Sequence, residues 1–247
     1  MGSPHAALSG PDRRFGARSL LIAVAVVLVA VPFLLLVLLV ESHSSGLRGI
    51  DNGARDGLHS LAVHNRMLVR LLQLISLSGS TLAWTLVFVP VTAWLLWRRL
   101  PRLAAFVAIT VVASSLLDNL VKSLVHRARP VLPDPVAHAG GQSFPSGHAQ
   151  AAIVGYGVLL LVFLPALHGA WRRVAPAVAV VMVLAIGFSR VALGVHYVSD
   201  VLAGYVLGAA WLIAMTAAFS AWQVERGRPA VRPSEGLAPE QADRLTP

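Results

Sequence analysis

Long apolar runs, separated by short polar segments, divide the chain into six stretches that predict membrane-spanning helices. Each run is close to the ~20 residues that an α-helix needs to cross the hydrocarbon core of a bilayer, although the fifth is short. The predicted spans are residues 19–40, 79–97, 103–121, 149–167, 174–189 and 201–224. The pattern therefore predicts an all-α polytopic membrane protein, a six-helix bundle within residues 19–224.

Three regions outside these spans complete the predicted organisation. Residues 1–18 are expected to be a cytoplasmic segment, and residues 225–247, which lack periodicity, a disordered cytoplasmic tail. Within residues 51–78, apolar residues recur at helical spacing and predict an amphipathic segment on the membrane surface or over the bundle. The first span is interpreted as a signal anchor and not a cleaved signal peptide, because its apolar run exceeds a signal core and no small-residue cleavage site follows.

Composition supports a membrane protein and excludes several other classes. Hydrophobic residues make up 56% of the chain and charged residues only 13%, whereas a soluble domain carries about 25% charged residues. The net charge of +9 does not indicate a nucleic-acid partner, because the arginines lie in short segments between apolar runs and form no basic face interleaved with aromatics. The chain has no cysteine, so disulfide and thiol chemistry are excluded.

The distribution of basic residues predicts the orientation. Twelve of the twenty lie before, between and after the spans on one side, and eight lie on the other. The positive-inside rule places the richer side, and with it both termini, in the cytoplasm. Three polar segments, residues 121–130, 144–149 and 189–200, then all lie at the outer face.

These outer segments contain cations that suit a phosphate group. Lys122 is the only lysine in the chain, and it is joined by Arg129 and Arg190 from other segments. Arginine binds phosphate in a planar fork, whereas lysine acts as a compact point charge. Taken singly, an interfacial arginine such as Arg190 is more often a membrane anchor than a ligand.

The same segments contain groups for nucleophilic and acid catalysis. Ser146 precedes an apolar run and marks a helix start, whose backbone N–H groups favour anions, although ordinary capping explains it equally well. His196 and Asp200 are four residues apart, so the carboxylate could accept from one imidazole nitrogen and leave the other as a nucleophile. His148 is then available as a general acid. This set calls for no metal and no cofactor, because the cations can stabilise the phosphoryl charge.

Together the segments resemble the tripartite signature of the type 2 phosphatidic acid phosphatase superfamily, K-x6-RP, PSGH and SR-x5-H-x3-D, with no motif position missing. The resemblance covers roughly residues 20–220. It implies that His196 attacks phosphorus to form a phosphohistidine, that Asp200 orients His196, and that His148 protonates the leaving group. It also implies a set of ligands for the phosphoryl oxygens: Lys122, Arg129, Ser146, Gly147 and Arg190.

The function that this resemblance implies is metal-independent hydrolysis of a membrane lipid phosphate or pyrophosphate at the outer face of the plasma membrane. Phosphatidic acid, phosphatidylglycerol phosphate, diacylglycerol pyrophosphate and undecaprenyl pyrophosphate all fit, because the signature recognises the phosphate and not the tail. A phosphotransferase would use the same site with another acceptor. Vanadium-dependent haloperoxidases share the signature but are soluble. A non-catalytic lipid carrier is expected to lose the nucleophile or the acid, and both are present. The oligomeric state stays open.

Other polar residues near the motifs have less specific expectations. Asp118 lies one helical turn before Lys122 and either orients it or serves as a cap. His138, in the loop before the second motif, either flanks the site or lies in solvent. Four further residues are expected to lie in solvent: His59, His64, His126 and Arg127. Tyr197 is expected to anchor the chain at the membrane interface.

Overall fold

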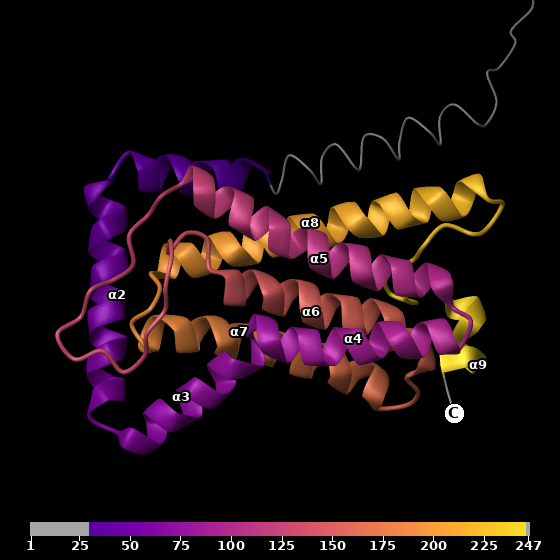
Figure 1. Cartoon of the computed structure of the whole chain (residues 1–247), viewed down its shortest axis with the longest axis horizontal. Coiled ribbons are helices and arrows are strands. Elements are labelled where there is room, and N and C mark those ends of the chain that lie inside the picture. The colour runs from indigo at the N-terminus through magenta and orange to yellow at the C-terminus, as the bar shows by residue number, and fades with distance from the viewer. Residues whose placement is uncertain (1–29, 246–247) are drawn as a thin grey trace, which may run out of the picture.

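Helices are the only regular secondary structure in residues 30–245, the part of the chain that the computed structural model describes. The long helices α4 to α8 run along the length of the molecule, and α2 lies across one end of them (Figure 1). The elements are α2 (Ser45–Val63), α3 (Arg66–Ser78), α4 (Thr81–Trp97), α5 (Pro101–Leu124), α6 (Gly147–Phe163), η1 (Leu164–Ala166), α7 (Trp171–Ala192), α8 (Val198–Glu225), η2 (Pro239–Gln241) and α9 (Ala242–Leu245). The predicted all-α class is confirmed.

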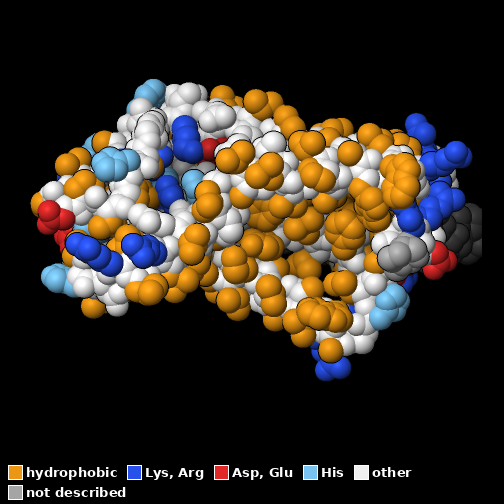
Figure 2. All heavy atoms as spheres, turned by 60° about the horizontal axis from the view of Figure 1, so that its bottom comes forward, with side chains coloured by type: hydrophobic (Ala, Val, Ile, Leu, Met, Phe, Trp, Pro, Cys, Tyr) orange, Lys and Arg blue, Asp and Glu red, His pale blue; other side chains and the backbone are white. Residues whose placement is uncertain are grey.

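Several of the helices are long and apolar enough to cross a membrane. Within the described residues, α5, α6 with η1, α7 and α8 meet this test, and they correspond to the last four predicted spans. Two further candidates are bent pairs: Ala30–Glu41 with α2, bent by 92°, and α3 with α4, bent by 42°. Apolar side chains cover the middle of the molecule between two more polar ends (Figure 2). The protein is therefore a multi-pass membrane protein with four such helices, or up to six spans if each bent pair is one.

The predicted first span lies partly outside the described residues, and the predicted amphipathic segment is two helices instead of one. The break falls at His64 and Asn65, where the Asn65 side chain accepts a hydrogen bond from Leu68 N and caps α3. An asparagine at this position ends one helix and starts the next because it satisfies a backbone N–H that the new helix leaves free. The break lets α2 cover the end of the bundle while α3 leads into α4.

The close contact between α6 and α8 determines how two of the motifs meet. Gly204 on α8 faces the start of α6, where a Cβ atom would lie 2.5 Å from the carbonyl oxygen of Ser146. The absence of a side chain lets the helices approach, and Ser146 N donates to the Asp200 carbonyl oxygen at 2.9 Å. The beginning of α6 and the beginning of α8 are thereby joined directly.

Residues 226–245 fold back onto the bundle, so the expectation of a disordered tail is wrong for this stretch. Leu237, Ala238 and Leu245 are buried in the main core. Leu237 N donates to the Leu161 carbonyl oxygen at 2.8 Å, which ties the tail to the end of α6. Burial of these apolar side chains against the core favours the ordered segment, even though their spacing shows no periodicity.

Candidate active site

A cavity of about 900 Å³ opens at the end of the bundle that α2 crosses. Basic, acidic and histidine side chains gather in a hollow at this end (left in Figure 2). Most of the predicted site residues line the cavity: Lys122, Arg129, Gly147, His148, Arg190 and His196. Ser146 and Asp200 are fully buried close to it. The structure therefore brings together all three sequence segments, which arrive from α5, α6, α7 and α8.

His196 and Asp200 form the predicted pair. His196 Nδ1 lies 3.4 Å from Asp200 Oδ2, and both side chains are buried. The same carboxylate oxygen accepts from Tyr197 N at 2.9 Å, which anchors it at the start of α8. On the other side of the ring, Arg129 Nη1 lies 3.0 Å from His196 Nε2. A guanidinium can only donate, so Nε2 accepts and Nδ1 carries the proton that Asp200 binds.

The surroundings of His196 keep its imidazole uncharged. Burial lowers the pKa of His196 to about 4, and the nearby Arg190 and Arg129 act in the same direction. The hydrogen bond to Asp200 and its negative charge oppose this effect without reversing it. A neutral imidazole with its Nε2 lone pair at the cavity is the form in which histidine acts as a nucleophile.

Lys122 is held by Asp118, as one of the two sequence interpretations expected. The Lys122 ammonium and Asp118 Oδ2 are 2.5 Å apart, at i and i+4 on α5. The pair packs against the first turn of α6: a Cβ on Gly147 would lie 2.8 Å from Asp118 Oδ2 and 3.0 Å from Lys122 Nζ. Glycine at this motif position leaves the ends of both side chains in place, whereas a Cβ would push them aside.

Arg129 and Arg190 are each anchored by neutral oxygens. Arg129 donates to the carbonyl oxygens of Gly140 and Gly141, both at 3.1 Å, and of Val195 at 2.9 Å. Burial lowers the pKa of Arg129, against the charges of Asp200 and Asp118, but the group stays a cation at neutral pH.

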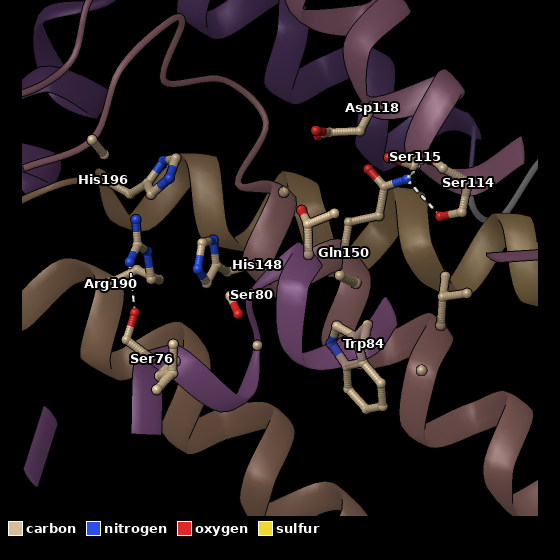
Figure 3. Close-up of a pocket in the computed structure, with 18 of the residues that line it drawn as sticks. Ser76, Ser80, Trp84, Ser114, Ser115, Asp118, His148, Gln150, Arg190 and His196 are labelled. Carbon is tan, nitrogen blue, oxygen red and sulfur yellow. Dashed lines mark hydrogen bonds between the residues drawn. The ribbon is translucent and has the colours of Figure 1, made fainter. Parts of the chain in front are cut away.

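Arg190 comes from the end of α7 and meets the two histidines. Its Nη1 donates to Ser76 Oγ at 2.6 Å, and its buried Nε has no hydrogen-bond partner in the described structure. The guanidinium lies beside His196 and His148, and His148 lies between His196 and Ser80 (Figure 3). A buried donor without a partner, next to two imidazoles, is suited to a ligand oxygen.

The sequence interpretation placed Arg127 wrongly. It was expected in solvent, but its guanidinium is partly buried and bonds two carboxylates, Asp200 Oδ1 at 2.5 Å and Asp51 Oδ2 at 2.8 Å. Burial opposes its charge, yet Asp200 and Asp51 raise the pKa of Arg127 above its usual value. Tyr197, expected as an interfacial anchor, has this guanidinium 4.2 Å from its ring centroid.

The remaining histidines divide between solvent and structure. His64 and His126 are exposed, as expected. His59 was expected in solvent and is instead buried, with Nε2 3.1 Å from the Asp134 carbonyl oxygen, because α2 packs onto the loop before the second motif. His138 lines the cavity, which agrees with the alternative that it flanks the site.

From the histidines the cavity continues as a groove between α4 and α5. Its lining becomes apolar towards the middle of the bundle, at Trp84, Phe88 and Val111. Thr85 on α4 and Leu116 on α5 line the groove and are exposed on the flank of the molecule. The groove is therefore open sideways, in the direction of the apolar belt.

Within residues 30–245, no group of three or more His, Asp or Glu side chains is arranged to hold a metal ion. Fold and site together define a class of protein: an all-α, multi-pass membrane protein whose cavity brings His148 and His196 to three cations, with the buried Asp200 carboxylate behind His196.

The chain belongs to the PAP2 superfamily, whose sequence model matches residues 100–223. It is 42% identical over 96 residues to phosphatidylglycerophosphatase B of Bacillus subtilis, an alignment that covers 38% of this chain and 46% of the relative. It is also 31% identical over 136 residues to an undecaprenyl-diphosphatase of Sulfolobus acidocaldarius, covering 51% of this chain and 60% of that protein. A lipid A 1-phosphatase of Rhizobium johnstonii is 34% identical over 124 residues, or 47% of each protein. The chain thus spans about half the length of most of these curated relatives.

A solved structure matches over a larger part of the chain. The crystal structure of a transmembrane PAP2 type phosphatidylglycerolphosphate phosphatase from Bacillus subtilis has a TM-score of 0.69 and 25% sequence identity. The match covers 77% of this chain and 93% of that one. The likeness includes the membrane-embedded helical architecture, in agreement with the fold described above.

Proposed function

We propose that the protein hydrolyses a phosphomonoester or pyrophosphate on a membrane lipid through a phosphohistidine intermediate. The observation that carries this proposal is the environment of His196: Nδ1 faces Asp200, while Nε2 faces the cavity beside Arg129. Relatives in three organisms that are named as lipid phosphatases support the same activity.

In the first step, His196 Nε2 attacks phosphorus and the bond from phosphorus to the lipid oxygen breaks. His148 gives its proton to that oxygen, so the lipid leaves as an alcohol or a monophosphate. Arg129 Nη1, which donates to Nε2 in the structure, then has a phosphoryl oxygen as its new acceptor. In the second step His148 accepts a proton from water, which attacks the phosphohistidine, breaks the P–N bond and releases phosphate.

The cations stabilise the phosphoryl oxygens during both steps. Lys122, Arg129 and Arg190 approach from different elements, and the first turn of α6 contributes backbone N–H groups. Two buried atoms without partners in the described structure, Ser146 Oγ and Arg190 Nε, would gain acceptors when a phosphoryl group binds. This supply of positive charge supports the proposal that the reaction needs no metal ion.

The groove between α4 and α5 supports a substrate that stays in the bilayer while its phosphate reaches the histidines. The part of the groove nearest the histidines is lined by polar side chains: Ser80, Thr81, Thr85, Ser114, Ser115, Asn119 and Gln150. Lys122 and Ser114 are eight residues apart on α5, so the polar wall extends ~12 Å below the lysine. A glycerol-containing headgroup matches such a wall, whereas a prenyl chain would place hydrocarbon against it. We therefore propose a glycerolipid phosphate as the preferred substrate.

The distribution of arginines supports a site at the outer face of the plasma (inner) membrane, with both termini in the cytoplasm. Arg98, Arg172 and Arg226 lie at the ends of α4, α7 and α8 that are remote from the site, where basic side chains gather (right in Figure 2). Positive residues mark the cytoplasmic side of a membrane protein. The cavity, at the opposite end, then opens to the outside.

Phosphate release by the purified protein in detergent tests the proposal. The assay contains EDTA and compares phosphatidic acid, phosphatidylglycerol phosphate and undecaprenyl pyrophosphate. We expect release from the glycerolipids to be fastest, to survive EDTA and to disappear in His196→Ala. His126→Ala is a matched control, because His126 is exposed in the neighbouring loop.

Release by a His196→Ala protein at the wild-type rate would refute the mechanism, and fastest release from undecaprenyl pyrophosphate would refute the headgroup proposal. Labelled phosphate on an added alcohol, in place of free phosphate, would indicate a phosphotransferase.

A further inference from the structure

We propose that Asp51, a residue of α2 outside the three motif segments, is a positioning residue for His196 and acts through Arg127 and Asp200. The proposal rests on the role of His196 as nucleophile that is proposed above. The proposal gives α2, the helix across the end of the bundle, a role in catalysis.

The carboxylate of Asp51 is almost completely buried, with 1% of the residue exposed. Its Oδ1 accepts from Ser199 N at 3.0 Å, and its Oδ2 accepts from Ser199 Oγ at 2.6 Å and from Arg127 Nη2 at 2.8 Å. A buried carboxylate is expensive unless donors surround it, and these donors come from α8 and from the loop after α5. Asp51 is therefore fixed between two motif-bearing segments that are distant from it in sequence.

Arg127 connects Asp51 to Asp200 with little freedom to adjust. Its Nη2 donates to Asp51, while its Nη1 donates to Asp200 Oδ1 at 2.5 Å and to Ser199 Oγ at 2.7 Å. The Tyr197 ring lies against the guanidinium, 4.2 Å from its central carbon to the ring centroid. Because the guanidinium is planar and rigid, the position of one carboxylate determines where the other can be bound.

The orientation of the Asp200 carboxylate in turn affects the nucleophile, His196. Arg127 binds its Oδ1, and the other oxygen, Oδ2, faces His196 Nδ1 at 3.4 Å. That contact is long for a hydrogen bond, so a small rotation of the carboxylate decides whether it forms. If Arg127 loses its hold on Asp51, the Asp200 carboxylate can turn about the hydrogen bond that Tyr197 N still donates to Oδ2. The hydrogen bond from His196 Nδ1 then weakens, although Arg129 continues to donate to Nε2 and keeps the proton on Nδ1.

A purely structural role for Asp51 is the alternative that the test must separate. α2 buries only Asp51, His59 and Ala62, so the aspartate also contributes to docking of the helix. His59 provides a matched control because it docks the same helix, through the Asp134 carbonyl oxygen, and forms no hydrogen bond to Arg127 or Asp200. Loss of docking alone should affect the Asp51 and His59 variants alike.

The kinetic test uses Asp51→Asn, Arg127→Lys, the double variant and His59→Ala, with dioctanoyl phosphatidic acid as the probe. The residues that orient metal-bound histidines contribute about 10- to 100-fold to activity. Asp51 and Arg127 orient His196 in a comparable way, so we expect kcat of each single variant to fall by about that factor. KM should stay within about twofold, because neither residue meets the substrate, and the double variant should be no worse than the poorer single variant. His59→Ala should lower Tm and leave kcat near the wild-type value. Additive losses, or an equal loss of kcat in His59→Ala, would overturn the proposal.

A spectroscopic test does not depend on turnover. The ring nitrogens of His196, assigned by comparison with His196→Gln, are observed by NMR in protein labelled with ¹⁵N-histidine. In the wild type the Nδ1–H proton should resonate downfield, because it is hydrogen-bonded to the Asp200 carboxylate. In Asp51→Asn this resonance should move upfield, while in His59→Ala it should match the wild type. An unchanged Nδ1–H resonance in Asp51→Asn would refute the positioning role. If the wild type releases no phosphate but Asp51→Asn still shows this change, the proposed function is refuted and the positioning role stays supported.

Discussion

Replacing Gly147 by alanine should impair catalysis by moving the neighbouring ion pair, without any change of charge. A Cβ at this position would lie 2.8 Å from Asp118 Oδ2 and 3.0 Å from Lys122 Nζ, whereas ordinary contacts begin at 3.4 Å. The carboxylate must therefore retreat by about 0.6 Å, the difference between 2.8 and 3.4 Å. Lys122 moves with it because the two side chains share a short hydrogen bond. The displaced Lys122 ammonium then lies farther from the phosphoryl oxygens of the substrate and stabilises their charge less.

The size of the effect follows from the cost of overpacking. Extra methyl groups in a tight site cost about 1–3 kcal/mol, which corresponds to a roughly 5- to 150-fold loss in kcat/KM if the strain is relieved at the expense of the transition state. Initial rates of phosphate release from dioctanoyl phosphatidic acid measure this loss, and thermal unfolding in detergent checks that the variant is folded. Gly57→Ala is the control, since a Cβ on Gly57 meets nothing within 4 Å. A folded Gly147→Ala protein with wild-type kcat/KM would refute the reasoning.

Three other changes test separate parts of the structure. Because burial and the nearby arginines set the pKa of His196 at about 4, kcat/KM should fall on the acid side only as the pH drops through that value; an acid limb near the ordinary histidine pKa of about 6.5 would contradict it. Lys122→Arg should lower kcat despite its conserved charge, because a planar fork cannot occupy the place of the ammonium beside Asp118; equal rates for both proteins would argue against a phosphate contact. Leu237→Ala should lower the free energy of unfolding by about 2–5 kcal/mol, since this side chain is buried in the main core; an unchanged Tm would show that the tail does not contribute to stability.

Much of the site could be predicted because its chemistry depends on short-range spacing. His196 and Asp200 meet because residues four apart at a helix start lie on one face, and Asp118 meets Lys122 for the same reason. The helical class and the last four spans could be predicted from apolar runs, since a helix in a bilayer must satisfy its own backbone and expose apolar side chains.

Tertiary packing decided which of the other polar residues belong to the site. Arg127 has the appearance of a loop arginine in the sequence, and nothing there links it to Asp51, 76 residues away. The role of Arg127 depends on α2, which lies across the end of the bundle (Figure 1) and brings the Asp51 carboxylate to the Arg127 guanidinium. The pattern of apolar runs does not predict this contact.

The same distinction separates the motifs from the rest of the chain. Spacing along one helix, the length of an apolar run and the sign of nearby charges are properties of the sequence itself, and they determined the last four spans and the residues of the three motifs. The burial of His59, the ordered tail around Leu237 and the chain of contacts from Asp51 to His196 came only with the tertiary structure. These contacts join segments far apart in sequence. A local pattern of apolar residues does not predict which polar group becomes buried, or which partner forms its hydrogen bonds.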